Sequence, residues 1–346
     1  MNLAIVCFTL NGFILSKQIK EAMEKKGHKV VLFTKSRYLQ EEDAFVMEES
    51  LKAWTEKRFA DKDAILFVGA TGIAVRSIAP FIKSKKEDPA VIVLDEGGNY
   101  CISLLAGHIG GANEWTLQIA EAVGASPVIT TATDVNHLFA VDVFAKKNDL
   151  HIADMSIAKE ISAALLHREA VGFVSDFPCK GKIPEELNCD SKNNKLGIYI
   201  GIKEDKKPFE RTLQLIPSCV TLGVGCKRNM EEKMIERRFL ELLEERKISL
   251  KAIHSVASID LKADEKGLKD FSEKFNLPFV TFSAEELLEL EGEFSSSGFV
   301  KSITGVDCVC ERAALKKSGG KLFQKKSAGE GVTLAMAVED RSVYFE

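Results

Sequence analysis

The sequence lacks the features of a membrane-anchored or disulfide-stabilised protein. No apolar stretch approaches the roughly 18 consecutive residues that a membrane-spanning helix needs. The N-terminus, Met-Asn-Leu-Ala-Ile-Val-Cys-Phe, has no basic region ahead of its short apolar run, unlike a signal peptide. The eight cysteines include no C-x-x-C pair and none of the spacing of a small disulfide scaffold. We therefore expect a cytoplasmic protein with reduced thiols and no membrane association.

A large excess of charge of one sign is also missing. Lys and Arg number 47 and Asp and Glu 51, which gives a net charge of −4 at pH 7. This balance argues against bulk attraction to nucleic acid or to an anionic membrane, so any anion-binding site must be local. No set of about four zinc ligands can be assembled. No P-loop is present, and the third glycine of a G-x-G-x-x-G fingerprint counted from Gly223 would fall on Arg228. The sequence therefore predicts neither a protein-bound metal nor a nucleotide.

What the chain does contain is a repeated alternation of strand-like and helix-like segments. Its 346 residues are more than one hydrophobic core usually serves, so several domains are expected. Apolar runs of strand length alternate with helical spacing, which is typical of parallel sheets covered by helices on both faces. In the first part of the chain, strands are predicted at Leu3–Phe8, Lys29–Phe33, Ala64–Val68, Ala90–Leu94 and Val128–Thr131, and helices at Glu48–Phe59, Ile73–Ile82 and Asn113–Val123.

The alternation pauses in the middle of the chain and then restarts, which predicts three parts. Residues 1–134 and 218–346 are each predicted to form a three-layer α/β/α domain with a largely parallel sheet. Residues 135–217 are rich in turn residues and predict a smaller α+β connecting module, in which Leu196–Ile202 and Thr212–Ile216 flank an exposed hairpin loop. In the C-terminal domain, strands are predicted at Val220–Val224, Ile253–Ile259, Pro278–Phe282 and Val332–Val338, and helices at Met230–Arg246, Glu265–Phe275, Ala284–Leu290 and Cys308–Lys317.

A histidine lies inside a glycine-rich segment just before a predicted helix. The segment Ser103-Leu-Leu-Ala-Gly-His-Ile-Gly-Gly-Ala-Asn113 places His108 among three glycines. Glycines let the backbone approach a ligand closely, and the free N–H groups at a helix start can bind an anion. The near-neutral pKa of an imidazole suits proton transfer during hydrolysis. The alternative is a histidine that merely holds its own loop in place.

Polar or glycine-rich segments follow three of the predicted strands. Val68 leads into Gly69-Ala-Thr-Gly72, Leu94 into Asp95-Glu96, and Thr131 into Thr133-Asp134. In parallel α/β sheets, ligands bind at the carboxyl ends of the strands. We therefore expect these segments and His108 to share one edge of the sheet and to form a single site.

Asp95 and Glu96 allow two interpretations. They follow a strand that is predicted to be buried and precede two glycines, so at least one carboxylate is expected to face the cleft, where burial would raise its pKa. The same Asp-Glu-Gly-Gly sequence is equally typical of an ordinary turn at the end of a strand. The residues alone do not decide between these.

The C-terminal part offers a second set of candidate anion-binding groups. Gly223-Val-Gly-Cys226 is predicted as a turn between a strand and a helix, and Lys227 and Arg228 add positive charge to it. Residues 311–326 carry six basic residues against one acidic residue. Two interpretations are open: a solvated helix face, and a segment that binds a polyanion. The first is favoured for the distal lysines and the second for the pair Glu311-Arg312.

Several of these segments resemble the cobalt-precorrin-5A hydrolase family of anaerobic cobalamin biosynthesis. In the N-terminal part the resemblance lies in Gly69–Arg76, Asp88–Glu96, Ser103–Asn113 and Pro127–Asp134. In the C-terminal part it lies in Gly223–Arg228, Ala257–Gly267 and Gly305–Ala314, although family members more often carry arginine and glycine at the positions of Lys227 and Asn229.

The resemblance implies a carbon–carbon hydrolase. Such an enzyme opens the δ-lactone of cobalt-precorrin-5A and releases acetaldehyde to give cobalt-precorrin-5B. It needs no cofactor of its own, because the cobalt is carried by the tetrapyrrole substrate. Its implied partners are that substrate and neighbouring enzymes of the corrin pathway. The main alternative is a non-catalytic corrinoid-binding or handover protein of the same pathway, and a nucleotide-linked α/β transferase is a third hypothesis.

Residue roles are assigned on this basis. His108 is expected to be the base and proton shuttle, Asp95 or Glu96 the group that orients it, and Arg76 an oxyanion donor together with the backbone amides of Gly110 and Gly111. The predicted substrate-binding residues are Gly69, Thr71, Gly72, Ser103, Gly107, Gly110, Gly111, Asn113, Thr131, Thr133, Asp134, Gly225, Cys226, Lys227, Arg228, Glu311 and Arg312.

Overall fold

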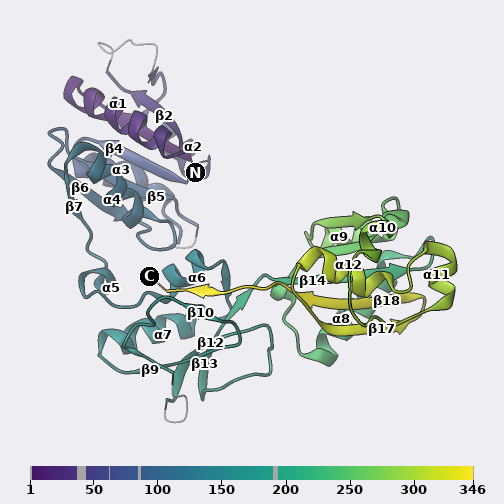
Figure 1. The fold of residues 1–346 in the computed structure, drawn as a ribbon. Coiled ribbons are helices and arrows are strands. Elements are labelled where there is room, and N and C mark those ends of the chain that lie inside the picture. Colours follow the sequence, from purple (N-terminus) through teal and green to yellow (C-terminus); the bar gives the residue numbers. More distant parts are fainter. Residues whose placement is uncertain (1, 37–43, 62, 85–86, 190–193, 346) are drawn as a thin grey trace. The chain divides into compact units, whose positions relative to one another are not determined.

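A computed structural model describes residues 2–36, 44–61, 63–84, 87–189 and 194–345 of the chain (Figure 1). It contains two compact units, Met1–Val143 and Phe144–Glu346. The prediction of a mixed α/β protein with largely parallel sheets is confirmed. The finer division into three domains stays a prediction. No described helix combines the length and the apolar composition needed to cross a membrane.

The first unit is built on a seven-stranded sheet with the order β3-β2-β1-β4-β5-β6-β7. Side chains alternate along β1, so Leu3 and Ile5 join one core with α1 and α4, whereas Ala4 and Val6 join a second core with α2 and α3. This alternation produces the three layers. The elements are β1 Asn2–Cys7, α1 Leu10–Lys25, β2 Lys29–Thr34, β3 Phe45–Val46, α2 Leu51–Asp61, β4 Ala64–Val68, α3 Thr71–Ile78, β5 Ala90–Leu94, β6 Tyr100–Leu105, α4 Ala112–Val123, β7 Ser126–Val128, α5 Ala132–Val135 and α6 Val141–Lys147, the last of which continues into the second unit.

Strand β6 reverses the direction of the chain. It pairs antiparallel with β5, with Leu94 opposite Cys101 and Val91 opposite Leu105, and β7 then runs parallel to β6. The carboxyl ends of β6 and β7 therefore lie at the edge of the sheet where β5 begins. The expectation that all candidate residues share one edge is wrong, because it did not include this strand.

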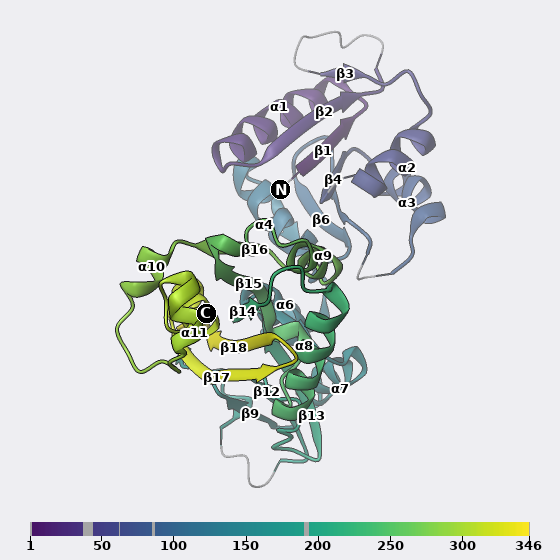
Figure 2. The same ribbon diagram turned by 90° about the vertical axis from the view of Figure 1, so that its right-hand side faces the viewer.

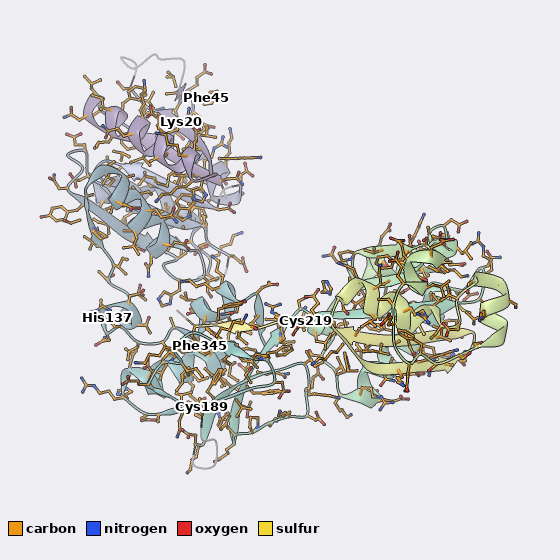
Figure 3. The ribbon with its side chains drawn as sticks, in the orientation of Figure 1. Lys20, Phe45, His137, Cys189, Cys219 and Phe345 are labelled. Atoms are coloured by element: carbon orange, nitrogen blue, oxygen red, sulfur yellow. The ribbon has the colours of Figure 1, made fainter. Side chains whose placement is uncertain are left out.

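The second unit contains two further five-stranded sheets. The first has the order β11-β9-β12-β13-β8, and β12 and β13 pair in parallel, so the hairpin expected between them is wrong. The chain returns to this region at its end, where β19 pairs with β10 and where Figure 3 labels Phe345. The ring of Phe345 stacks on that of Phe144. The elements are β8 Leu150–Ile152, α7 Met155–Leu166, β9 Val171–Ser175, β10 Cys179–Lys180, β11 Leu187–Asn188, β12 Leu196–Ile200, β13 Arg211–Pro217 and β19 Val343–Tyr344.

The other sheet of this unit has the order β16-β15-β14-β18-β17 and mixes parallel and antiparallel pairs. Helices α8 and α9 lie on one side of it, and α10 and α11 on the other (Figure 2). We call residues 220–338 the C-terminal lobe. Its elements are β14 Val220–Cys226, α8 Glu232–Arg246, β15 Ile253–Ile259, α9 Lys266–Lys274, β16 Phe279–Phe282, α10 Ala284–Leu288, α11 Gly298–Thr304, α12 Val309–Ser318, β17 Lys321–Gly329 and β18 Val332–Val338.

Two expectations about this lobe are corrected. Gly223 and Gly225 lie within β14 and not in a turn. A Cβ at Gly223 would lie 1.8 Å from the carbonyl oxygen of Cys310, so glycine here lets α12 pack directly on the strand. Lys321, Lys325 and Lys326 belong to β17, so they are not on a solvated helix face.

Candidate functional site

The candidate residues of the first unit fall at two opposite edges of its sheet. Gly69, Thr71, Gly72, Arg76, Asp95 and Glu96 follow the carboxyl ends of β4 and β5. His108 follows β6, and Thr131, Thr133 and Asp134 follow β7. The two edges are separated by the five residues of β5, which span about 13 Å at about 3.3 Å per residue. The structure therefore does not bring Arg76, Asp95 or Glu96 to His108.

His108 lies between two aspartates. Its Nε2 is 2.6 Å from Oδ2 of Asp134, and its Nδ1 is 3.3 Å from Oδ1 of Asp142. The hydroxyl of Thr133 lies 3.2 Å from the same Nε2. The side chains of His108 and Asp142 are 13% and 12% exposed, whereas that of Asp134 is 38% exposed. Asp142 thus holds Nδ1 of the imidazole from the protein interior. The opposite nitrogen, Nε2, contacts the carboxylate of Asp134, which solvent can reach.

The contact with Asp142 changes the acidity of the histidine. The hydrogen bond with Asp142 raises the pKa of His108 above its ordinary value, burial opposes this, and the hydrogen bond with Asp134 raises the pKa further. The direction of the shift favours an imidazolium that donates from both ring nitrogens. In this state His108 is a proton donor, and the role of base and proton shuttle that the sequence led us to expect stays a prediction.

A polar network supports Asp134. The amide of Asn113 donates to Oδ2 of Asp134 at 3.1 Å and to the hydroxyl of Thr131 at 3.2 Å. The hydroxyl of Ser103 donates to Oδ1 of Asn113 at 2.7 Å. Ser103, His108, Asn113, Thr131, Thr133 and Asp134, all predicted from the sequence, are therefore brought together.

Asp142 was missed by the sequence reasoning. It lies in the first turn of α6, and the only local signal is an acidic residue near the start of a short helix. Such residues are common at helix starts, so the signal has little specificity. Its position beside His108 depends on the path of the chain after α5, which no local pattern predicts.

The glycines of the His108 loop shape the loop itself. A Cβ at Gly110 would lie 2.4 Å from that of Ala106, and one at Gly107 would lie 2.7 Å from Oδ1 of Asn113. The N–H of Gly111 donates to the carbonyl of His108 at 3.0 Å. Gly111 is therefore not available as an oxyanion donor, and that expectation is wrong. A donor role for Gly110 stays a prediction.

Asp95 forms a turn and does not orient His108. Its carboxylate accepts hydrogen bonds from the backbone N–H groups of Gly97, Asn99 and Tyr100. Burial alone would raise the pKa of Asp95, but these bonds together with that from the Asn99 amide lower it overall. Glu96 is exposed in the same turn. The turn interpretation accounts for both residues, and the orienting contacts to His108 come from Asp142 and Asp134 instead.

Glu311 and Arg312 are engaged within the C-terminal lobe. The buried Glu311 accepts from the N–H and hydroxyl of Ser295 and from the N–H of Lys326 at 2.6–2.8 Å. Arg312 pairs with Asp307 at 2.8 Å and donates to the backbone carbonyls of Leu287, in the last turn of α10, and Leu290, just after it. Both charges are satisfied inside the lobe, so the expectation that they contact a ligand is replaced by a structural role.

The lobe also contains a cavity of about 880 Å³ that is open to solvent on one side. Gly225, Cys226, Lys227 and Arg228 line it, and their predicted role in binding a substrate stays a prediction. Burial raises the pKa of Cys226 to about 11, so this thiol is not a nucleophile near neutral pH. Helix α11, which the sequence reasoning missed, supplies part of the wall.

Comparison with known proteins gives matches along the whole chain. Three family models match in order, described as Cobalamin synthesis G N-terminal over residues 53–134, Cobalamin biosynthesis central region over 139–217, and Cobalamin synthesis G C-terminus over 220–337. The cobalt-precorrin-5A hydrolase of Salmonella typhimurium is 34% identical, covering 97% of each chain. That of Priestia megaterium is 29% identical, covering 97% of this chain and 95% of its own. The crystal structure of a cobalamin biosynthesis protein G homolog from Sulfolobus solfataricus is 24% identical, with a TM-score of 0.43 and 97% of both chains covered.

Proposed function

We infer that this chain, which belongs to the cobalt-precorrin-5A hydrolase family, is a hydrolase of cobalamin biosynthesis that opens the δ-lactone of cobalt-precorrin-5A and releases acetaldehyde. The observation that carries this proposal is the 34% identity to a curated hydrolase over 97% of both chains. The curated relatives are named as enzymes, which favours catalysis over the alternative of a corrinoid carrier. The cobalt is proposed to arrive within the tetrapyrrole.

We assign proton transfer to the pair formed by His108 and Asp134. Opening a lactone by water breaks the acyl C–O bond, so the attacking water must lose a proton and the departing ring oxygen must gain one. The imidazolium of His108 donates to the ring oxygen from Nε2, while the exposed carboxylate of Asp134 accepts the proton of the water. The 2.6 Å contact between the two groups lets the proton pass back to His108.

The second step, cleavage of the carbon–carbon bond, uses the same pair to remove the proton from the oxygen that was protonated in the first step. The freed hydroxyl gives its proton to Asp134 or His108, and its oxygen becomes the carbonyl oxygen of acetaldehyde. The electron pair of the breaking carbon–carbon bond moves onto the metallated macrocycle. Asp142 takes no proton in this scheme; it holds Nδ1 and thereby directs Nε2 toward the reacting atoms.

The test is release of acetaldehyde from cobalt-precorrin-5A by the purified full chain. Wild type should produce one acetaldehyde per substrate, and His108→Gln should lose at least about a hundredfold in rate, the lower range for a proton-transfer group. His167→Gln, at an exposed histidine that ends α7, is the matched control and should retain the wild-type rate. A spectral change of the substrate without any acetaldehyde would favour a carrier. Full activity of His108→Gln would remove the assignment of the residue.

A further inference from the structure

The cavity of the C-terminal lobe lies outside the His108 network and has a wall of mixed character. Its apolar part is formed by side chains from β15, α11, α12, β18 and the segment after β15, namely Ile259, Leu261, Val300, Ile303, Val309 and Val332. A volume of about 880 Å³ is within the range of sites for large small-molecule ligands. The apolar surface is suited to the body of such a ligand and not to a simple ion.

Four basic side chains also line the cavity, and two of them are already neutralised. Arg228 forms a bidentate pair with Asp264 at 2.6 and 2.8 Å, and Lys262 pairs with Glu265 at 3.0 Å. Among the described residues, no carboxylate forms an ion pair with Lys227 or Lys326. These two ammonium groups are therefore the cations left to meet a ligand.

The acidic group in the cavity wall does not cancel these cations. Glu330 lines the cavity but is paired with Arg237 of α8. The lining thus carries a net positive charge beside an apolar surface. An uncharged apolar ligand would leave both ammonium groups uncompensated, whereas a ligand with carboxylate arms would pair with them.

The part of the wall that carries α11 is held in place by polar contacts. Ser295, just before α11, is bound by Glu311, and Ser297 at the start of α11 donates to the carbonyl of Asp307 at 3.1 Å. The guanidinium of Arg312 lies 4.1 Å from the ring centroid of Phe294. The segment that carries α11 is therefore fixed at both of its ends, which makes the cavity a built feature of the lobe.

We propose that this cavity binds the tetrapyrrole by one apolar face of its macrocycle, with carboxylate arms paired to Lys227 and Lys326. The identification of the ligand as a tetrapyrrole rests on the proposed function, because an apolar body with several peripheral carboxylates is what that substrate offers. The chemistry required by the cavity, an apolar body with at least two carboxylates, excludes a single-headed fatty acid as its natural ligand.

The experiment is a titration of the full chain with cobyrinic acid, a corrinoid whose arms are free carboxylates, followed by visible absorbance. Each of Lys227→Ala and Lys326→Ala should weaken binding about tenfold, as expected for one lost charge-assisted contact. Lys325→Ala is the matched control, because Lys325 is the exposed neighbour of Lys326 on β17 and does not line the cavity, and it should bind like wild type. Cobinamide, whose arms are amides, should bind more weakly and should not respond to the lysine substitutions.

A second variant tests the apolar wall without changing charge. Ile303 is 60% exposed, so Ile303→Trp should fold normally while filling the cavity, and it should weaken cobyrinic acid binding at least tenfold. No binding of cobyrinic acid by wild type, equal affinities of the lysine variants and Lys325→Ala, or binding of palmitate in its place would each overturn the proposal. His108→Gln should bind cobyrinic acid normally. Wild type that binds cobyrinic acid and responds to the lysine substitutions but releases no acetaldehyde from cobalt-precorrin-5A would show that the proposed chemistry fails and that this site does not.

Discussion

Nδ1 of His108 lies 3.3 Å from Oδ1 of Asp142, in a contact that fixes the imidazole from the protein interior. The exposed Asp134 meets the opposite nitrogen. The histidine is therefore oriented by one carboxylate, and in the proposed mechanism it exchanges protons beside the other. This division of roles is the basis of the first two predictions.

Replacing Asp142 by Asn should lower the pKa of His108, because the largest contribution that raises it is removed. At neutral pH less imidazolium would then be available to donate a proton, and the rate of acetaldehyde release should fall about tenfold to a hundredfold, part of what proton transfer contributes. The His108 ring protons, followed by NMR against pH, should show the lower pKa directly. Glu114→Gln, at an exposed position on α4, is the control and should leave both the titration and the rate unchanged. An unchanged His108 titration in Asp142→Asn would contradict the prediction.

Stability should depend on pH through the same histidine. The pKa of His108 is raised in the folded protein, so its pairing with the aspartates stabilises the fold fully below the unfolded pKa of about 6.5 and is lost as pH rises through the folded value. The difference in free energy of unfolding between wild type and His108→Gln should therefore shrink above about pH 6.5. Urea unfolding at a series of pH values measures it. In an Asp134→Asn, Asp142→Asn background the trend should vanish or reverse, and its persistence there would point to another group.

The buried strands of the first unit were predicted from the sequence, but β6 was missed, and with it the reversal of strand direction. Continuous apolar runs fix β4 and β5 at Ala64–Val68 and Ala90–Leu94, because strands buried on both faces leave no other pattern. Strand β6 is half-buried and has no clear alternation. Because β6 was not predicted, the sheet was expected to be parallel throughout this region. His108 was therefore placed at the same edge as Asp95, whereas the antiparallel β6 carries it to the opposite edge.

The site residues likewise divide into those with a local sequence signal and those whose role depends on tertiary structure. Ser103 in β6 and the residues that follow β6 and β7, up to Asp134, were found because glycine and hydroxyl residues next to a helix start form a local signal. Asp142 was not found, because its place depends on tertiary structure. Glu311 and Arg312 were interpreted as ligand contacts since a sequence does not show whether a charge is already paired inside the fold.

Gly223→Ala should destabilise the C-terminal lobe. The added Cβ would lie 1.8 Å from the carbonyl oxygen of Cys310 and 2.9 Å from the Cβ of Ala314, so α12 would have to move off β14. Overpacking of this kind costs about 3 kcal/mol of unfolding free energy. Gly298→Ala is the matched control in the same lobe, since no atom lies within 4 Å of its added Cβ, and it should change stability by less than about 0.5 kcal/mol. Equal stabilities in urea would show that the contact between helix and strand is looser than described.

Glu311→Gln should lower the free energy of unfolding, and any effect on ligand binding should be secondary to this loss. The carboxylate accepts three hydrogen bonds, whereas a glutamine would turn its NH₂ group toward some of the same donors and lose about 2 kcal/mol. Burial alone would raise the pKa of Glu311, but the bonds from Lys326 and Ser295 lower it overall, so the stabilisation is present above the unfolded pKa of about 4.3 and is lost as pH falls through the folded value. Urea unfolding between about pH 3 and 6 should show that the difference in free energy of unfolding between wild type and the variant becomes smaller as pH falls.

Glu289→Gln, which removes an exposed pair with Lys316, is the control and should cost less than about 1 kcal/mol. A Glu311→Gln protein of wild-type stability that nevertheless binds cobyrinic acid poorly would show that this carboxylate acts on the ligand and does not merely hold the wall of the cavity.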